Sequence, residues 1–181
     1  FRVLQRMANP LGLSLFSFII PQHQRILDFL KTLPYVDRER LAFYGLSYGG
    51  KTAVRVPAVL EDYCLSICSG DFNEWVWKTC SARSPFSYLR TGEYEMPEFN
   101  LAMTFNYAEM SYLICPRPFM VERGHWDSVS SDEWVSCEYA KTRYRYDLLG
   151  LGDRTEIEYF NGPHEIHAVG TFEFLDKHLR S

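Results

Sequence analysis

The spacing of apolar residues along the first third of the chain predicts helices and strands in alternation. A helix is predicted over residues 21–33, where apolar positions recur on one face and Pro21 occupies the first turn. The apolar run at residues 41–44 predicts a strand, and a helix is expected to follow from Tyr48. Residues 63–68 predict the next strand. Alternation of this kind is typical of a parallel sheet with helical crossovers.

Residues 71–100 interrupt this alternation. The segment shows no clear period and is rich in aromatic residues and proline, namely Trp75, Trp77, Phe86, Tyr88, Tyr94, Phe99, Pro85 and Pro97. A segment this long without periodicity is usually functional or an insertion. It follows a strand on the same edge of the sheet as the turn at residue 47, so we expect a cap-like insertion at about residues 71–100.

After the insertion the alternation resumes. Ser130 and Glu133 have the spacing of a capping box that opens a helix. The predicted elements are a helix at 102–113, a strand at 119–122, a helix at 130–149, a strand at 155–160 and a helix at 170–179. The whole pattern predicts an α/β fold with a mostly parallel sheet and helices on both faces, forming a single domain over residues 1–181.

The bulk composition excludes several classes of protein. The chain has 181 residues, enough for one domain with a substantial core, and its hydrophobic fraction of 46% is typical of globular proteins. The net charge is −4 and no cluster of lysine and arginine stands out, which argues against a nucleic-acid partner. The longest apolar run, residues 11–20, is too short to span a membrane. The sequence leaves open the oligomeric state and the compartment, cytoplasmic or secreted.

Ser47 is the strongest candidate for a chemical role. It stands in the pattern Gly-x-Ser-x-Gly at residues 45–49, between a predicted strand and a predicted helix. This is the form of a nucleophile elbow, in which a sharp strand-to-helix turn holds the serine oxygen clear of the backbone. In such an elbow the backbone N–H of the next residue, here Tyr48, is one donor of the oxyanion hole. The alternative is a serine in a tight turn with no chemical role.

Two further residues follow predicted strands in the order that this chemistry requires. A serine needs a base to take its proton, and the base needs a third group to orient it. Asp127 follows the strand at 119–122, and His164 follows the strand at 155–160. The order serine, aspartate, histidine is that of the α/β-hydrolases. The sequence therefore predicts Ser47, Asp127 and His164 as a catalytic triad.

Each partner of the serine has a competitor. Glu122 at the end of its strand is an alternative acid, and Asp132 is another, although its position favours a role at a helix N-terminus. His167, three residues beyond His164, is the alternative base.

The sequence gives weaker evidence for other kinds of ligand site. His125, His164 and His167 lack the spacing of a defined metal site. Lys51 follows glycines as in a phosphate-binding loop, but the spacing is one residue short of that motif. Trp126, Trp75 and Trp77 could line a substrate pocket, and packing explains them equally well. No metal or organic cofactor is predicted.

Four segments carry a family resemblance: residues 36–50 leading into the elbow, Pro-Arg-Pro at 116–118 with Gly-x-x-Asp at 124–127, Gly-Pro-His at 162–164, and Phe-x-Phe-Leu at 172–175. Together they resemble the α/β-hydrolase superfamily, in its dienelactone hydrolase-like and acetyl xylan esterase-like branch, from about Pro21 onward. The resemblance implies that this chain is the C-terminal portion of the domain. The earlier strands, and the loop with the second oxyanion donor, would then precede Phe1.

The predicted function is a serine esterase that cleaves carboxylic esters through an acyl-enzyme. The resemblance favours a small-molecule or carbohydrate ester as substrate, with acetyl esters on carbohydrate as the leading case. Two alternatives stay open at this point. One is a serine peptidase of the same fold, and the other is a non-catalytic binding protein of the same fold.

Overall fold

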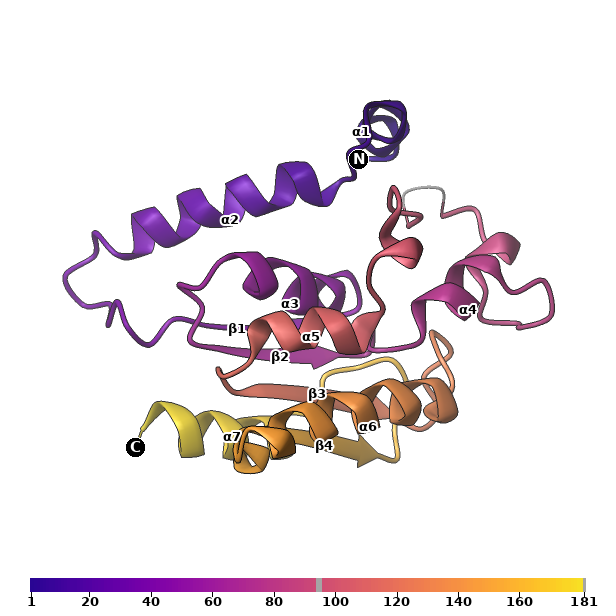
Figure 1. The fold of residues 1–181 in the computed structure, drawn as a ribbon. Helices are drawn as coiled ribbons and strands as arrows, with labels where there is room; N and C mark the ends of the chain where they lie inside the picture. The colour runs from indigo at the N-terminus through magenta and orange to yellow at the C-terminus, as the bar shows by residue number, and fades with distance from the viewer. Residues whose placement is uncertain (94–95, 181) are drawn as a thin grey trace.

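Four parallel strands form the central sheet of the protein, in the order β1-β2-β3-β4 (Figure 1). The computed structural model describes residues 1–93 and 96–180. The strands are β1 (Ala42–Leu46), β2 (Leu65–Ser69), β3 (Phe119–Gly124) and β4 (Thr155–Phe160). Every neighbouring pair is parallel, so all four carboxyl ends lie at one edge of the sheet. The predicted parallel sheet is confirmed.

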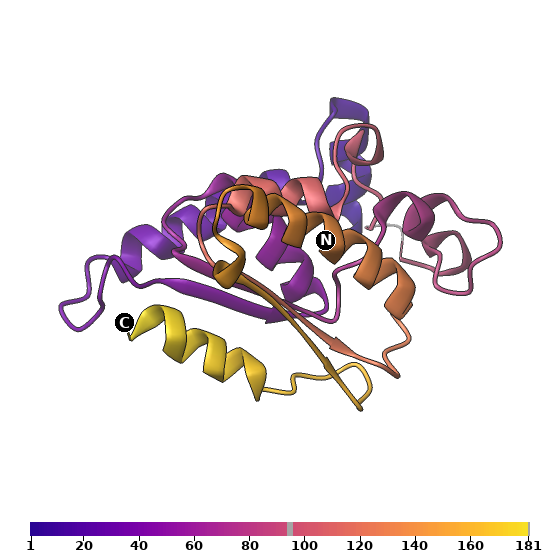
Figure 2. The same cartoon turned by 60° about the horizontal axis from the view of Figure 1, so that its bottom comes forward.

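Helices cover both faces of the sheet, as predicted. The helices α3 (Tyr48–Val59), α5 (Tyr107–Ile114) and α6 (Asp132–Leu148) cover one face, and α7 (Gly170–Leu179) lies on the other (Figure 2). Successive side chains of a strand point to opposite faces. Accordingly, Phe119 and Val121 join the larger core under α3, α5 and α6, whereas Met120 packs against Phe174 of α7.

The helix α2 (Phe16–Leu30) begins five residues before the predicted start at Pro21, so that prediction is wrong at its N-terminus. Pro21 lies inside the helix rather than at its first turn. Phe16 is 4% exposed and belongs to a cluster with Leu27 and Val56 of α3. Burial of this aromatic ring holds the additional helical turn, which the local proline signal does not anticipate.

Two short helices precede α2. They are α1 (Arg2–Ala8) and the 3₁₀ helix η1 (Asn9–Leu11). Within the described residues, no single helix is long and apolar enough to cross a membrane. Only Arg2–Leu11 and Phe16–Leu30 taken together reach that length and apolarity, and they are bent by 111° at their junction.

The segment between β2 and α5 is irregular, as expected, with the short helices α4 (Trp75–Cys80), η2 (Tyr88–Arg90) and η3 (Leu101–Met103). Tyr94 lies outside the described residues. The helix predicted from residue 102 begins at Tyr107, because Asn106 and Glu109 form a capping box there. The predicted capping box at Ser130 is also wrong: Ser131 caps α6, accepting a hydrogen bond from the Trp134 N–H. A last 3₁₀ helix, η4 (Gly152–Arg154), precedes β4.

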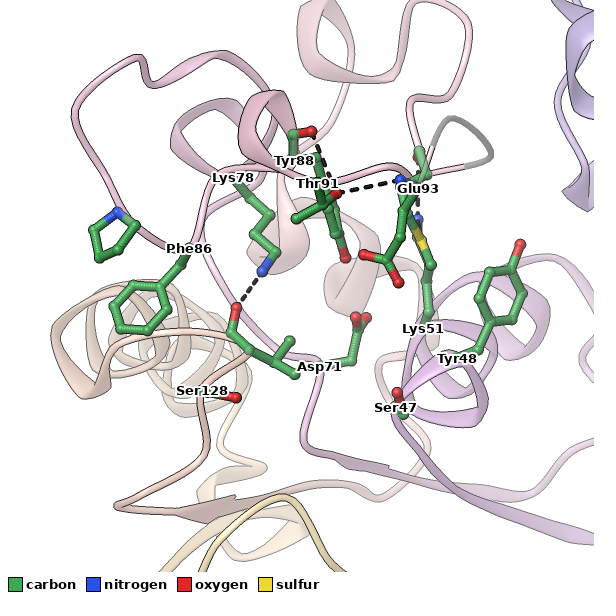
Figure 3. Close-up of a pocket in the computed structure, with 13 residues that line it drawn as sticks. Ser47, Tyr48, Lys51, Asp71, Lys78, Phe86, Tyr88, Thr91, Glu93 and Ser128 are labelled. Carbon is green, nitrogen blue, oxygen red and sulfur yellow. Dashed lines mark hydrogen bonds between the residues drawn. The ribbon is translucent and has the colours of Figure 1, made fainter. Parts of the chain in front are cut away.

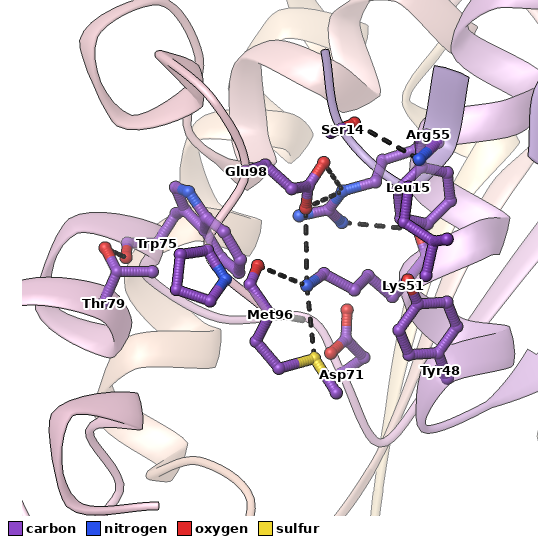
Figure 4. A network of polar contacts seen from close by, with 12 residues as sticks. Ser14, Leu15, Tyr48, Lys51, Arg55, Asp71, Trp75, Thr79, Met96 and Glu98 are labelled. Carbon is purple, nitrogen blue, oxygen red and sulfur yellow. Dashed lines mark hydrogen bonds and ion pairs between the residues drawn. The ribbon is translucent and has the colours of Figure 1, made fainter. Parts of the chain in front are cut away.

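A buried ionic network fastens the insertion over α3 (Figure 4). Arg55 donates from Nε to Glu98 at 2.8 Å, and Lys51 Nζ lies 3.4 Å from the same carboxylate. Lys51 also donates to the Met96 carbonyl at 3.2 Å and lies 4.5 Å from the centre of the Trp75 ring. Burial lowers the pKa of Lys51 to about 8. The network therefore fixes part of the insertion beside the elbow.

Candidate active site

The backbone at Ser47 has the strained conformation of a nucleophile elbow. Its φ of 61° and ψ of −118° lie in a region that residues other than glycine rarely adopt. A Cβ added to Gly45 would lie 2.4 Å from the carbonyl carbon of Gly49, and one on Gly50 would lie 2.3 Å from the Ser69 carbonyl oxygen. The close approach of strand and helix therefore requires glycine at positions 45 and 50, whereas a Cβ on Gly49 would meet no atom within 4 Å.

A backbone hydrogen bond connects the elbow to the neighbouring strand. The Ser47 N–H donates to the Ser69 carbonyl at the end of β2, at 3.0 Å. The Ser47 hydroxyl makes no capping hydrogen bond to α3, which begins at Tyr48. Ser47 is thus the last residue before a helix N-terminus, where backbone N–H groups have no partner within the helix.

His164 and Asp127 are brought together from loops that follow β4 and β3. His164 Nδ1 lies 2.7 Å from Asp127 Oδ2, and the Asp127 side chain is 1% exposed. The hydrogen bond to Asp127 raises the pKa of His164 against the opposing effect of burial. With Nδ1 donating to the carboxylate, the neutral ring presents Nε2 as a proton acceptor.

The loop that carries Asp127, which we call the acid loop, is held by contacts from several sides. Asp127 Oδ1 accepts a hydrogen bond from the Val129 N–H at 2.8 Å, and Arg123 Nη1 lies 3.5 Å from Asp127 Oδ2. Arg123 also donates to the Ser130 carbonyl at 2.7 Å. From α4 in the insertion, the buried Lys78 amine donates to the Val129 carbonyl. These contacts keep the acid loop in one position.

The ring of His164 lies beside the elbow. Gly70 follows Ser69 directly, and a Cβ on Gly70 would lie 2.9 Å from both Nδ1 and Cε1 of His164. The residue before it, Ser69, is the one that accepts the Ser47 N–H. In the described part of the chain, no hydrogen bond joins Ser47 to His164. Such bonds are often long in unliganded hydrolases and shorten when substrate binds.

The competing acids have other partners. Asp132 pairs with His125 at 2.6 Å and with Arg123 at 2.9 Å. Glu122 is 1% exposed and accepts hydrogen bonds from the hydroxyls of Tyr44 and Ser69. It also accepts the backbone N–H groups at residues 167 and 168, at 3.2 and 3.1 Å. Glu122 therefore connects the loop at residues 167 and 168 to the ends of the strands. Neither Glu122 nor Asp132 forms a hydrogen bond or an ion pair with His164.

His167, the competing base, also has partners other than Asp127. His167 Nδ1 lies 2.7 Å from Glu158, and its ring stacks on Phe160 at a centroid distance of 4.4 Å. His125, His164 and His167 thus each face a different carboxylate. Among the described residues, no group of three histidine, cysteine, aspartate or glutamate side chains is placed to hold a metal ion.

A polar cavity of about 160 Å³ lies between the elbow and the insertion (Figure 3). Ser47 and Tyr48 line one side, and Lys51, Asp71 and Lys78 point toward its centre. Aromatic and further polar walls come from the insertion and the acid loop, namely Pro85, Phe86, Tyr88, Thr91, Glu93, Met96, Ser128 and Val129. Residues of the irregular segment between β2 and α5 thus line the same cavity as Ser47.

Asp71 is a site residue that sequence reasoning missed. It accepts a hydrogen bond from the Tyr107 hydroxyl at 2.5 Å, and burial raises its pKa to about 6, opposed by the charges of Arg55 and Lys51. The available signal was its position two residues after the end of β2, at the carboxyl edge of the sheet. Lys78 had no such signal, because only the folded insertion carries it to the acid loop.

The parallel sheet, the elbow and the order of the strands define an α/β-hydrolase fold. A carbohydrate esterase family 15 glucuronoyl esterase from Caldicellulosiruptor kristjansonii shares it with a TM-score of 0.72 and 21% identity, over 89% of this chain and 49% of that chain. A glucuronoyl esterase from Teredinibacter turnerae has a TM-score of 0.68 and 16% identity, over 87% of this chain and 45% of that chain. The Pyrococcus furiosus esterase Pf2001 has a TM-score of 0.59 and 16% identity, over 88% of this chain and 62% of that chain.

The chain therefore spans about half the length of these glucuronoyl esterases. No protein-family model matches the sequence. No curated protein matches it by sequence either. At this level of identity the structural likeness establishes the fold, and the predicted α/β-hydrolase architecture is confirmed.

Proposed function

We propose that the protein is a serine hydrolase that cleaves carboxylic esters at Ser47. The observation that carries the proposal is the strained elbow at Ser47, on the same sheet edge as a hydrogen-bonded His164–Asp127 pair. A backbone in this conformation costs stability, and such strain persists where the surrounding structure and the function require it. The fold shared with several esterases adds independent support.

In the proposed reaction, the Ser47 oxygen attacks the ester carbonyl while His164 Nε2 takes the serine proton. Asp127 keeps the imidazole oriented and stabilises its charged form. The Tyr48 N–H, at the start of α3, donates to the oxyanion. The alcohol leaves with the proton from His164, and water then repeats the steps on the acyl-enzyme. The chemistry uses no metal or organic cofactor.

The substrate that we propose is an ester on a carbohydrate, with residues 71–100 acting as a cap over the site. Two ammonium groups, of Lys51 and Lys78, and two carboxylates, of Asp71 and Glu93, line the cavity, which suits hydroxyl-rich ligands better than acyl chains of lipids. Solved structures of this fold include enzymes described as glucuronoyl esterases. The leading candidates are acetyl esters of xylan and methyl esters of glucuronic acid.

The test is Ser47→Ala, assayed with 4-nitrophenyl acetate, acetylated xylan and methyl glucuronate, together with fluorophosphonate labelling. The variant should lose at least about 10³-fold in kcat and all labelling, because the nucleophile is gone. Ser17→Ala, an exposed serine in α2, is the matched control and should behave as the wild type. Unchanged turnover in Ser47→Ala would contradict the proposal.

The same assays separate the two alternatives. A peptidase would cleave short peptide amides with little preference for the corresponding esters. A binding protein would show neither turnover nor labelling in the wild type.

A further inference from the structure

Trp126 presents an indole ring that the fold itself does not use. The chain has four tryptophans. Trp75, Trp77 and Trp134 each pack against another aromatic ring, at centroid distances of 6.0 to 6.3 Å. In the described part of the chain Trp126 has no such partner, and it is 69% exposed. Its backbone N–H donates to the Gly162 carbonyl at 3.0 Å, so the exposed ring stands on a fixed loop.

The ring lines a hollow of about 460 Å³ beside the loop that carries Asp127. We call this space the Trp126 hollow. Its walls also include Phe86, the hydroxyls of Ser128 and Ser131, and the carboxylate of Glu133. Glu133 is exposed and lies in the first turn of α6. Nearby, Asp132 contacts His125 at 2.6 Å and accepts a hydrogen bond from Arg123 at 2.9 Å. An aromatic ring surrounded by hydroxyl and carboxylate acceptors is thus open to solvent.

The Trp126 hollow adjoins the cavity at Ser47. Phe86 and Ser128 line both spaces. In Figure 3 these two residues lie on the side of the cavity opposite Ser47 and Tyr48. A ligand that reacts at Ser47 and continues past Phe86 would therefore enter the Trp126 hollow.

We propose that the Trp126 hollow is a distal subsite for a sugar residue in the chain of an oligosaccharide whose ester reacts at Ser47. A pyranose ring presents a flat C–H face that stacks on an indole and hydroxyls that donate to carboxylates and serine oxygens at the ring edge. A lipid chain would desolvate these carboxylates without pairing them. A nucleic acid would bring its phosphates against Asp132 and Glu133.

The substrate assignment rests on the proposed function, but binding to the subsite can be measured without turnover. In a Ser47→Ala background, unesterified xylohexaose or cellohexaose is titrated while tryptophan fluorescence and heat are followed. At least one of the two should bind saturably, and Trp126→Ala should weaken that binding about tenfold. Trp126→Phe, which keeps an aromatic ring, should restore most of it.

Trp77→Ala is the matched control, because Trp77 is also exposed, at 58%, and lines neither space. It should leave binding unchanged. The proposal is overturned if neither hexasaccharide binds, or if Trp126→Ala binds as tightly as its parent.

A second readout uses catalysis. In Trp126→Ala, the ratio of kcat/KM on acetylated xylohexaose to that on 4-nitrophenyl acetate should fall about tenfold relative to the wild type. An equal loss on both esters would overturn the subsite, because it would indicate damage to the adjacent Asp127. Absence of ester hydrolysis in the wild type would instead contradict the proposed function, and the binding titration would still decide the subsite.

Discussion

At the residue scale, the protonation of His164 connects the geometry of the site to its chemistry. Its contact with Asp127 raises the pKa of the imidazole above the ordinary 6.5. In the proposed mechanism His164 is the general base and must be neutral to accept the serine proton, so this shift would limit activity on the acid side. The same shift stabilises the folded protein at pH values below about 6.5. That contribution is lost as the pH rises through the pKa of the folded state.

We predict that Asp127→Asn lowers kcat by about 10²–10⁴-fold and moves the acid limb of kcat/KM to lower pH. The loss of the carboxylate removes both the orientation of the ring and the charge that raises its pKa. The measurement is the pH profile of 4-nitrophenyl acetate hydrolysis. Glu158→Gln removes the partner of His167 instead and should leave the acid limb in place. An unmoved limb in Asp127→Asn would exclude Asp127 as the orienting acid.

At the element scale, hydrogen bonds connect the insertion to the acid loop. The helix α4 sends Lys78 to the Val129 carbonyl, and the Val129 N–H donates to Asp127. The amine is buried, and burial lowers its pKa to about 8. Movement of α4 would therefore be transmitted to Asp127 through two hydrogen bonds. This makes Lys78 a positioning residue for the proposed triad.

We expect Lys78→Met to lower kcat about tenfold, because the acid loop loses its anchor on the insertion. Lys78→Gln keeps a donor of similar reach and should recover part of that loss. Lys177→Met, at an exposed lysine of α7, is the control and should change neither kcat nor the pH profile. If Lys78→Met altered only the free energy of unfolding, with kcat unchanged, a positioning role would be excluded.

At the scale of the whole molecule, the two faces of the sheet are unequally protected. Among the described helices, α3, α5 and α6 pack on one face, and α7 packs on the other (Figure 2). Phe174 is the large aromatic anchor of α7 and is 1% exposed among Leu65, Ile67 and Met120. The integrity of that face depends strongly on one side chain.

Phe174→Ala should therefore reduce the free energy of unfolding by about 3–5 kcal/mol, through lost burial and the cavity that remains. Phe172→Ala, on the same helix but 57% exposed, should change it by less than about 0.5 kcal/mol. Urea unfolding followed by circular dichroism measures both values. Equal effects of the two variants would show that α7 is not docked through Phe174.

The periodicity of the sequence predicted the parallel sheet because buried strands and amphipathic helices leave a local signature. The strand at residues 155–160 and the helix at 170–179 occur where that signature placed them. The boundaries that were wrong depended on packing or on competing caps. The ring of Phe16 extends α2 to a start before Pro21, and Ser131 rather than Ser130 caps α6.

The sequence by itself determined the elbow motif and the order of serine, aspartate and histidine, because these depend on local turn chemistry and on chain order. It favoured Asp127 over Glu122 as the acid, but chain order alone does not show which of these two residues reaches the histidine. Only the tertiary structure decided that Asp127 contacts His164 while Glu122 braces residues 167 and 168. It also brought Lys78 to the loop that carries Asp127. The place of Lys78 follows from long-range packing of the insertion, which no local pattern encodes.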